Sequence, residues 1–70
     1  MKLDIFWEYK RLDDSVSAWV YVYHYGEIKI ASHAGYHDGE FAAERACINN
    51  ASVIARVVRL CGAIATVRKL

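Results

Sequence analysis

The residues from Val16 to Tyr25 alternate between two kinds of side chain, and this pattern constrains the fold more than any other feature of the sequence. One alternate set is mainly aliphatic and the other mainly aromatic. The first set is Val16, Ala18, Val20, Val22 and His24, and the second is Ser17, Trp19, Tyr21, Tyr23 and Tyr25. A period of two is the period of a β-strand, whose successive side chains point to opposite faces of a sheet. The segment is therefore predicted to be a central strand with an aliphatic face and an aromatic face.

Shorter alternating segments lie on both sides of this strand. Before it, one set of alternate residues is apolar and the other is mostly charged. The first set is Leu3, Ile5, Trp7 and Tyr9, and the second is Asp4, Phe6, Glu8 and Lys10. After Gly26, Ile28 and Ile30 alternate with Glu27, Lys29 and Ala31. Residues 11–15 are a polar break, and Gly26 can supply the positive φ of a tight hairpin. These features predict a meander of three antiparallel strands.

A single long helix is predicted over residues 39–61, with Asp38 as its N-cap and Gly62 just beyond its end. Residues placed at 100° steps fall on two opposite faces. The polar face holds Arg45, Asn49, Ser52, Arg56 and Arg59, and the apolar face holds Ala43, Cys47, Ala51, Ile54, Val58 and Cys61. The polar face continues through Asn49 and Asn50, which favours one helix over two.

These elements predict one α+β domain over residues 1–70, in which a three-stranded antiparallel sheet carries one long helix on one face. Ten strand residues and twenty-two helical residues both span about 33 Å, so the helix can cover the whole central strand. The valine face of that strand is the expected partner of the helix. A short edge strand is favoured for residues 63–70.

The composition weighs against several classes of function. The net charge is +1, whereas a duplex-binding domain usually carries a strong basic excess. Asp4 and Glu8 interrupt any signal-like start, and no apolar segment is long enough to cross a bilayer, so a cytoplasmic protein is expected. Cys47 and Cys61 are expected to be small buried residues in a reducing compartment, since about 21 Å of helix separates them.

The aromatic face is the most informative candidate site. If the valines face the helix, Trp19, Tyr21, Tyr23 and Tyr25 point to the uncovered side, where Phe6 can join them. Such residues could bind a protein partner or stack on bases. They could also stabilise a half-exposed sheet through cross-strand pairing alone. All three interpretations remain open at the level of sequence.

The helix arginines form the second candidate site. Arg45, Arg56 and Arg59 could meet an acidic partner or a nucleic-acid backbone, or could simply be a solvated helix face. The apolar arc of the helix is wider than one sheet requires, because Val53, Val57 and Leu60 flank the core line. A surplus of apolar surface on so short a chain predicts a two-fold homodimer.

No catalytic, metal or cofactor site is expected. His33 and His37 precede the helix and have no cysteine near enough to complete a tetrahedral set. The only paired carboxylates, Asp13 and Asp14, lie in a turn, and neither cysteine has a histidine close in sequence. The chain is therefore expected to be non-enzymatic.

The order of elements from Val16 to Arg59 resembles two kinds of small protein. One is the double-stranded-RNA-binding fold, but that fold has a helix before its sheet and a basic start to its last helix. This chain has Gly39-Glu40-Phe41-Ala42-Ala43-Glu44 at the corresponding place. The other is the set of phage-encoded anti-CRISPR proteins, which disable a host complex by binding it. The resemblance is one of pattern and transfers no functional residue. It implies an inhibitor that binds a host protein complex, with an RNA or single-stranded DNA binding module as the alternative.

Overall fold

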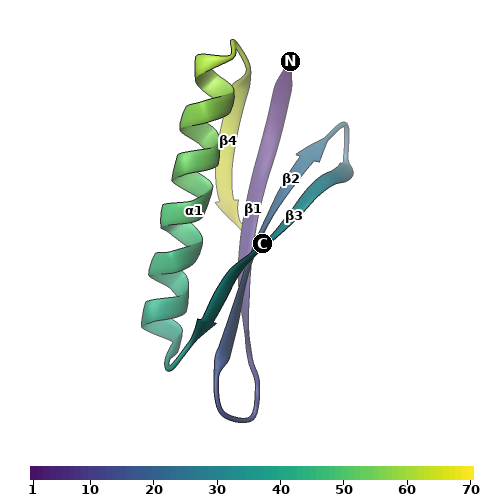
Figure 1. Ribbon diagram of the computed structural model, residues 1–70. Helices are drawn as coiled ribbons and strands as arrows, with labels where there is room; N and C mark the ends of the chain where they lie inside the picture. Colours follow the sequence, from purple (N-terminus) through teal and green to yellow (C-terminus); the bar gives the residue numbers. More distant parts are fainter.

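The computed structural model describes residues 1–70 and contains one sheet and one helix. The strands are β1 (Lys2–Arg11), β2 (Val16–His24), β3 (Glu27–His37) and β4 (Ile64–Lys69), and the helix is α1 (Glu40–Leu60). The strand order is β3-β2-β1-β4. The helix lies along one side of the sheet, and no element covers the other side (Figure 1). The predicted α+β class is confirmed, as is the short C-terminal strand.

The sheet is mixed, so the prediction of a purely antiparallel sheet is wrong at one edge. β2 pairs antiparallel with both β1 and β3, whereas β4 pairs parallel with β1. Parallel neighbours need a long crossover connection, and α1 supplies it. The helix carries the chain back along the sheet, so that Ile64 enters beside Lys2 and β4 runs in the same direction as β1.

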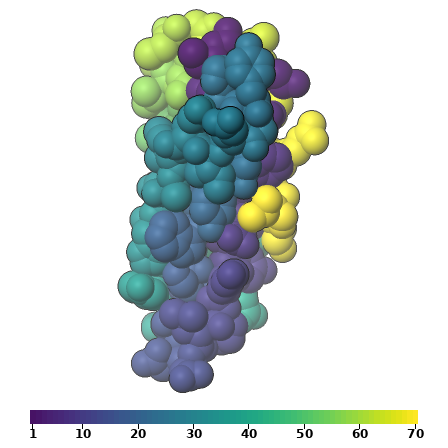
Figure 2. All heavy atoms as spheres, turned by 90° about the vertical axis from the view of Figure 1, so that its right-hand side faces the viewer, coloured from purple at the N-terminus to yellow at the C-terminus, as the bar shows by residue number.

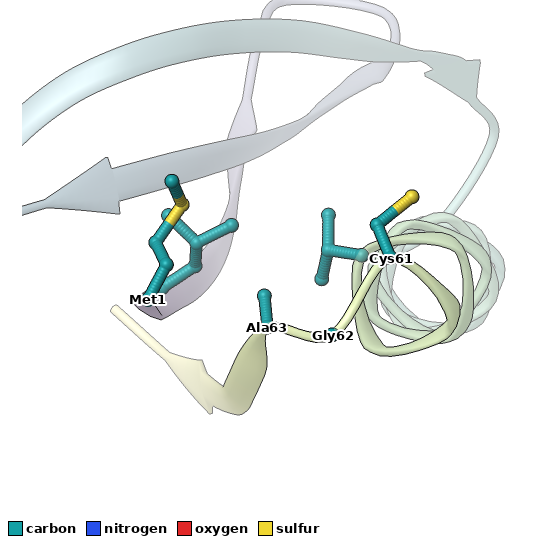
Figure 3. A pocket seen from close by; sticks show the side chains of 6 residues that line it. Met1, Cys61, Gly62 and Ala63 are labelled. Atoms are coloured by element: carbon teal, nitrogen blue, oxygen red, sulfur yellow. The ribbon is translucent and has the colours of Figure 1, made fainter.

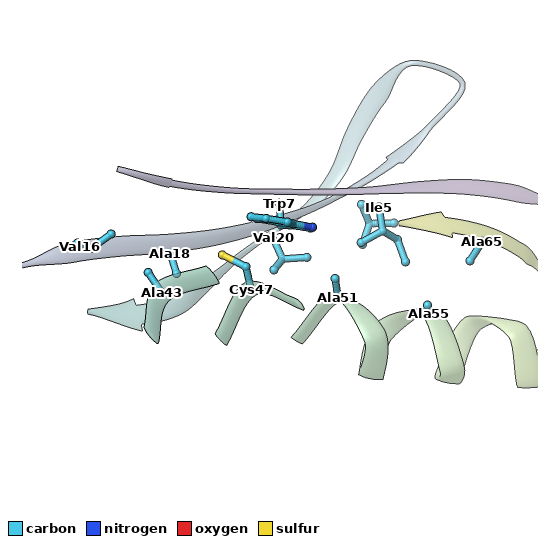
Figure 4. Packing of buried hydrophobic residues seen from close by; sticks show 11 residues of the cluster. Ile5, Trp7, Val16, Ala18, Val20, Ala43, Cys47, Ala51, Ala55 and Ala65 are labelled. Atoms are coloured by element: carbon cyan, nitrogen blue, oxygen red, sulfur yellow. The ribbon is translucent and has the colours of Figure 1, made fainter. Parts of the chain in front are cut away.

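The core lies between the sheet and the helix. Val20 is fully buried, with Ile5 and Trp7 of β1 beside it. The buried side chains of the helix are small and lie at four-residue intervals, namely Ala43, Cys47, Ala51 and Ala55, which point at the strands in Figure 4. Ile54 and Val58 pack beside them and are partly buried. Small residues allow the helix backbone to approach the sheet closely, and the Cys47 thiol donates to the carbonyl of Glu8 at 3.3 Å. The predicted pairing of the valine face with the helix is confirmed.

The two ends of α1 differ from the predictions in detail. Gly39, not Asp38, is the N-cap, and no side chain caps the first turn. Cys61 is the C-cap and is exposed, so the expectation that both cysteines are buried is wrong for this one. Gly62 has φ +93° and occupies the left-handed position that was predicted for it. α1 lacks the length of apolar sequence that a helix needs to cross a membrane.

β3 is much longer than the predicted strand, because it continues past Ala31 to His37. The alternation is hidden in the sequence by irregularities of pairing, one of them opposite Ser17 to Trp19. Gly35, with φ +95°, lies in this region, and the His37 ring folds back to hydrogen-bond the carbonyl of Ala34 at 2.9 Å. A Cβ on Gly35 would lie 3.2 Å from His37 Nε2, so glycine suits both the φ angle and the space.

Candidate binding surface

The side of the sheet opposite α1 carries the side chains that alternate with the core residues, and we call it the open face. All four strands contribute to it, and Figure 2 views the molecule from this side, with β4 in yellow at the right. Its members on β1 and β2 are Lys2, Asp4, Phe6, Glu8, Lys10, Ser17, Trp19, Tyr21 and Tyr23. Its members on β3 and β4 are Ile28, Ala31, His33, Tyr36, Ile64, Thr66 and Arg68. The strand pairing therefore places the predicted aromatic residues Trp19, Tyr21 and Tyr23 on one surface.

Ring contacts join these side chains into what we call the aromatic cluster, made of Phe6, Trp19, Tyr21, Tyr23, His33 and Tyr36. Phe6 meets Tyr23 edge to face with ring centroids 5.2 Å apart. Trp19 lies parallel to Tyr21 at 6.3 Å and contacts His33 at 4.7 Å. His33 in turn contacts Tyr36 at 4.5 Å. Contacts of this kind hold aromatic rings in fixed orientations while leaving part of each ring exposed.

Hydrogen bonds fix the polar groups within the cluster. The Tyr21 hydroxyl donates to the Glu8 carboxylate at 2.5 Å. Burial, and secondarily this bond to Glu8, raises the pKa of Tyr21 to about 12. The Ser17 hydroxyl and His33 Nε2 are 2.9 Å apart, and Thr66 donates to Asp4 at 2.7 Å. The rings of the open face are therefore held in defined orientations before any partner binds.

The charges on the open face nearly balance. Asp4 and Glu8 are the acidic groups, and Lys2, Lys10 and Arg68 are the basic ones. Both carboxylates already accept a hydrogen bond from a neighbouring hydroxyl. The face thus has three basic groups against two acidic ones, which is a small excess for following a phosphate backbone.

The predicted arginines do not join this surface, because all three lie on α1, in the other layer of the molecule. The Arg45 guanidinium lies 5.7 Å from the ring centroid of Phe41. Arg59 donates to the carbonyl of Ala65 at 2.7 Å, and Arg56 is exposed. Tyr25 is also set apart, since it has φ +53° in the β2–β3 turn and its ring contacts His24.

The sequence did not point to three members of the open face. Gly35 and the irregular pairing mask the strand around His33 and Tyr36 in the sequence. Nothing in the sequence distinguishes Ser17, which is 7% exposed and lies within hydrogen-bond distance of His33. The signal in the sequence was Tyr36, three positions after His33, because a β-bulge between the two residues can place both side chains on the same face.

Outside the open face, the remaining candidate sites are the two thiols and one cavity. Cys47 is buried, and desolvation raises the pKa of its thiol. Met1, Leu3, Val58, Cys61, Gly62 and Ala63 line an apolar cavity of about 260 Å³ at the C-terminal end of the helix (Figure 3). No group of three or more His, Cys, Asp or Glu side chains is arranged to hold a metal ion.

The chain was compared with known proteins at three levels. No protein-family model, no curated protein and no solved structure matches it.

Proposed function

We propose that this chain is a small non-enzymatic binding protein whose open face docks on a protein partner. The mode of action would be that of a phage-type inhibitor, which blocks a host complex by occupying one of its surfaces. The observation that carries the proposal is the aromatic cluster, an ordered group of rings on a sheet face that no element of the chain covers (Figure 1).

The composition of the open face supports a protein partner. Protein interfaces are enriched in Trp and Tyr near their centres, where a few such residues supply most of the binding energy. Trp19 and Tyr21 lie at the middle of β2, whereas Lys10 and Arg68 lie near the rim. Rings that are already oriented lose little conformational freedom when a partner binds.

The alternative is an RNA or single-stranded DNA binding module. Aromatic side chains on a sheet face can stack on bases, and the open face offers several. The positions of the basic residues weigh against this alternative, because Arg45, Arg56 and Arg59 lie on the helix side. Bases stacked on Trp19 would therefore have their phosphates near a face with only a small excess of positive charge.

Two binding assays on the same protein separate these functions. The first titrates single-stranded RNA and DNA at low and moderate salt, where a nucleic-acid binder shows strong binding that weakens steeply as salt rises. We expect no such binding. The second captures proteins from a bacterial lysate on immobilised wild type, on Trp19→Ala and on Arg56→Ala. We expect a discrete protein that the Trp19 variant loses and the Arg56 variant keeps, whereas salt-sensitive nucleic-acid binding would overturn the proposal.

A further inference from the structure

The two edges of the sheet are protected to different degrees. An edge strand presents unpaired main-chain N–H and C=O groups, which can pair with a strand of another chain. At the β4 edge, the main-chain amides of Ile64 and Leu70 donate to Met1 and Trp7 of β1. Main-chain groups alternate in direction along a strand, so those of Ala65 point away from the sheet. The Arg59 guanidinium donates a hydrogen bond to the outward-pointing carbonyl of Ala65 at 2.7 Å.

On β3 the one side chain that hydrogen-bonds a main-chain carbonyl is His37, which bonds Ala34 at 2.9 Å, and no side chain bonds the main chain of Ala31 or His33. Met1 and Trp7, both at odd-numbered positions, direct their carbonyls to β4. Since main-chain groups alternate in direction along a strand, the even-numbered residues of β1, such as Glu8, direct theirs to β2. Glu8 is paired with Trp19, so the next residue, Val20, faces β3 and pairs with Ser32. It follows that Ala31 and His33, on either side of Ser32, direct their main-chain groups outward to solvent.

Part of β3 also lacks the usual defences of an edge strand. Such strands are commonly shielded by charged residues, by proline, by β-bulges or by shortness. The pairing of β3 is irregular opposite Ser17 to Trp19 and opposite Val22 to Tyr23, and between these two places, from Ile30 to His33, it is regular. β3 has 11 residues, and Lys29 is the last charged side chain before Asp38. No proline occurs in the chain. The stretch from Ile30 to His33 is thus a regular, uncharged edge on which the main-chain groups of Ala31 and His33 point outward.

We propose that the outer edge of β3 is a docking site for an extended segment of the partner protein, which adds to the sheet as a fifth strand. This inference rests on the proposed function, because it specifies how the partner engages the open face. The main chain of the segment would pair with Ala31 and His33. Its alternate side chains would lie beside the rings of His33 and Tyr36, so uncharged segments with β-branched or aromatic residues at alternate positions should bind best.

A partner segment fits this edge better than a second copy of the chain. His33 and Tyr36 belong to both the β3 edge and the aromatic cluster, so one partner can occupy the edge and fold over the cluster. Two copies joined through their β3 edges would form one wider sheet, with both open faces still exposed to water. Only a different chain would cover the rings and the edge together.

The test uses peptides selected from a random dodecapeptide library against the intact protein. The decisive variant is Ala31→Pro, which removes one outward N–H, and Ala31→Val is its control because it has similar bulk and keeps the N–H. We expect selected peptides to bind the Pro variant at least about tenfold more weakly than the Val variant. We also expect bound peptide to slow hydrogen exchange at the amides of Ala31 and His33 in wild type, a measurement that does not depend on the Pro variant folding.

Each other outcome overturns the inference in a recognisable way. Peptides that bind both variants equally and leave the two amides unprotected would use the open face alone, and the proposed function would survive. A library that yields no binder would remove the edge as a peptide site. Concentration-dependent protection of the same amides without peptide would identify a second copy as the occupant.

Discussion

The Tyr21 hydroxyl donates a hydrogen bond to the Glu8 carboxylate, O···O 2.5 Å, across the β1–β2 ladder on the side of the sheet away from the helix. The bond ties the centre of the aromatic cluster to the neighbouring strand. It also satisfies one of the two acidic groups of the open face. The ring of Tyr21 consequently has a fixed orientation beside Trp19.

The first prediction concerns the titration of Tyr21. Its pKa is raised from 10.0 to about 12, chiefly by burial and then by the bond to Glu8. The folded protein holds this proton more tightly than the unfolded chain. The contribution of Tyr21 to the free energy of unfolding is therefore constant below pH 10 and falls as the pH rises toward 12. We expect Tyr21→Phe to reduce the fall in that interval. Tyrosinate absorbance in both proteins checks this, and a Tyr21 that titrates together with exposed tyrosines would contradict it.

The second prediction compares neighbouring residues on β2. Val20 is fully buried against the helix, so Val20→Ala should lower the free energy of unfolding by about 1 to 3 kcal/mol. Tyr21 lies on the open face, and Tyr21→Ala should cost about 1 kcal/mol or less from lost cross-strand pairing. Urea denaturation of both variants measures the difference. Equal losses would mean that a second subunit covers the open face, and a larger loss for Tyr21 would mean that the aromatic side is the core.

The sequence predicted the parts of the fold that have a regular period. Val16 to His24 could be read as a strand because its two faces differ in chemistry, and α1 could be read because Arg45 through Arg59 follow a helical period. The parallel direction of β4 could not be read, because six terminal residues do not reveal which edge they join. That choice depends on where the helix returns the chain.

The candidate site was predictable only on β1 and β2, for a related reason. Trp19, Tyr21, Tyr23 and Phe6 follow the two-residue period, whereas the irregular pairing around Gly35 conceals His33 and Tyr36. The contact of Arg59 with Ala65 was hidden for another reason. It joins a helix residue to a strand whose position the sequence did not reveal.

The third prediction concerns the two thiols. Cys61 is exposed, whereas Cys47 is buried and its thiol pKa is raised by desolvation. A disulfide reagent at neutral pH should therefore modify one thiol quickly and the other only when the protein unfolds, since the thiolate is the reactive form. Cys61→Ser should lose the fast phase, and Cys47→Ala should keep it. Fast modification of Cys47 in folded Cys61→Ser would show that the helix does not pack on the sheet as described.

The fourth prediction is self-association. Several large apolar side chains of the helix remain exposed, namely Phe41, Ile48, Val53, Val57 and Leu60. Exposed apolar surface of this extent favours association, for which a two-fold dimer is the simplest form. Light scattering over a concentration series should show a rising mass, and Val53→Ser with Val57→Ser should suppress the rise. A strict monomer at hundreds of micromolar would contradict the prediction.

The proposed function predicts which face of the molecule touches the partner. A photo-crosslinking residue in place of Tyr36, which is 67% exposed on the open face, samples one face. The same residue in place of Arg56 samples the exposed side of the helix and serves as the matched control.

Photo-crosslinking of these two proteins in a bacterial lysate tests the claim that the open face binds a protein. We predict that the crosslinker at position 36 yields a discrete, nuclease-resistant protein adduct, which Trp19→Ala abolishes, and that the crosslinker at position 56 yields none. An adduct at position 56 alone, or an adduct at position 36 that nuclease removes, would contradict it.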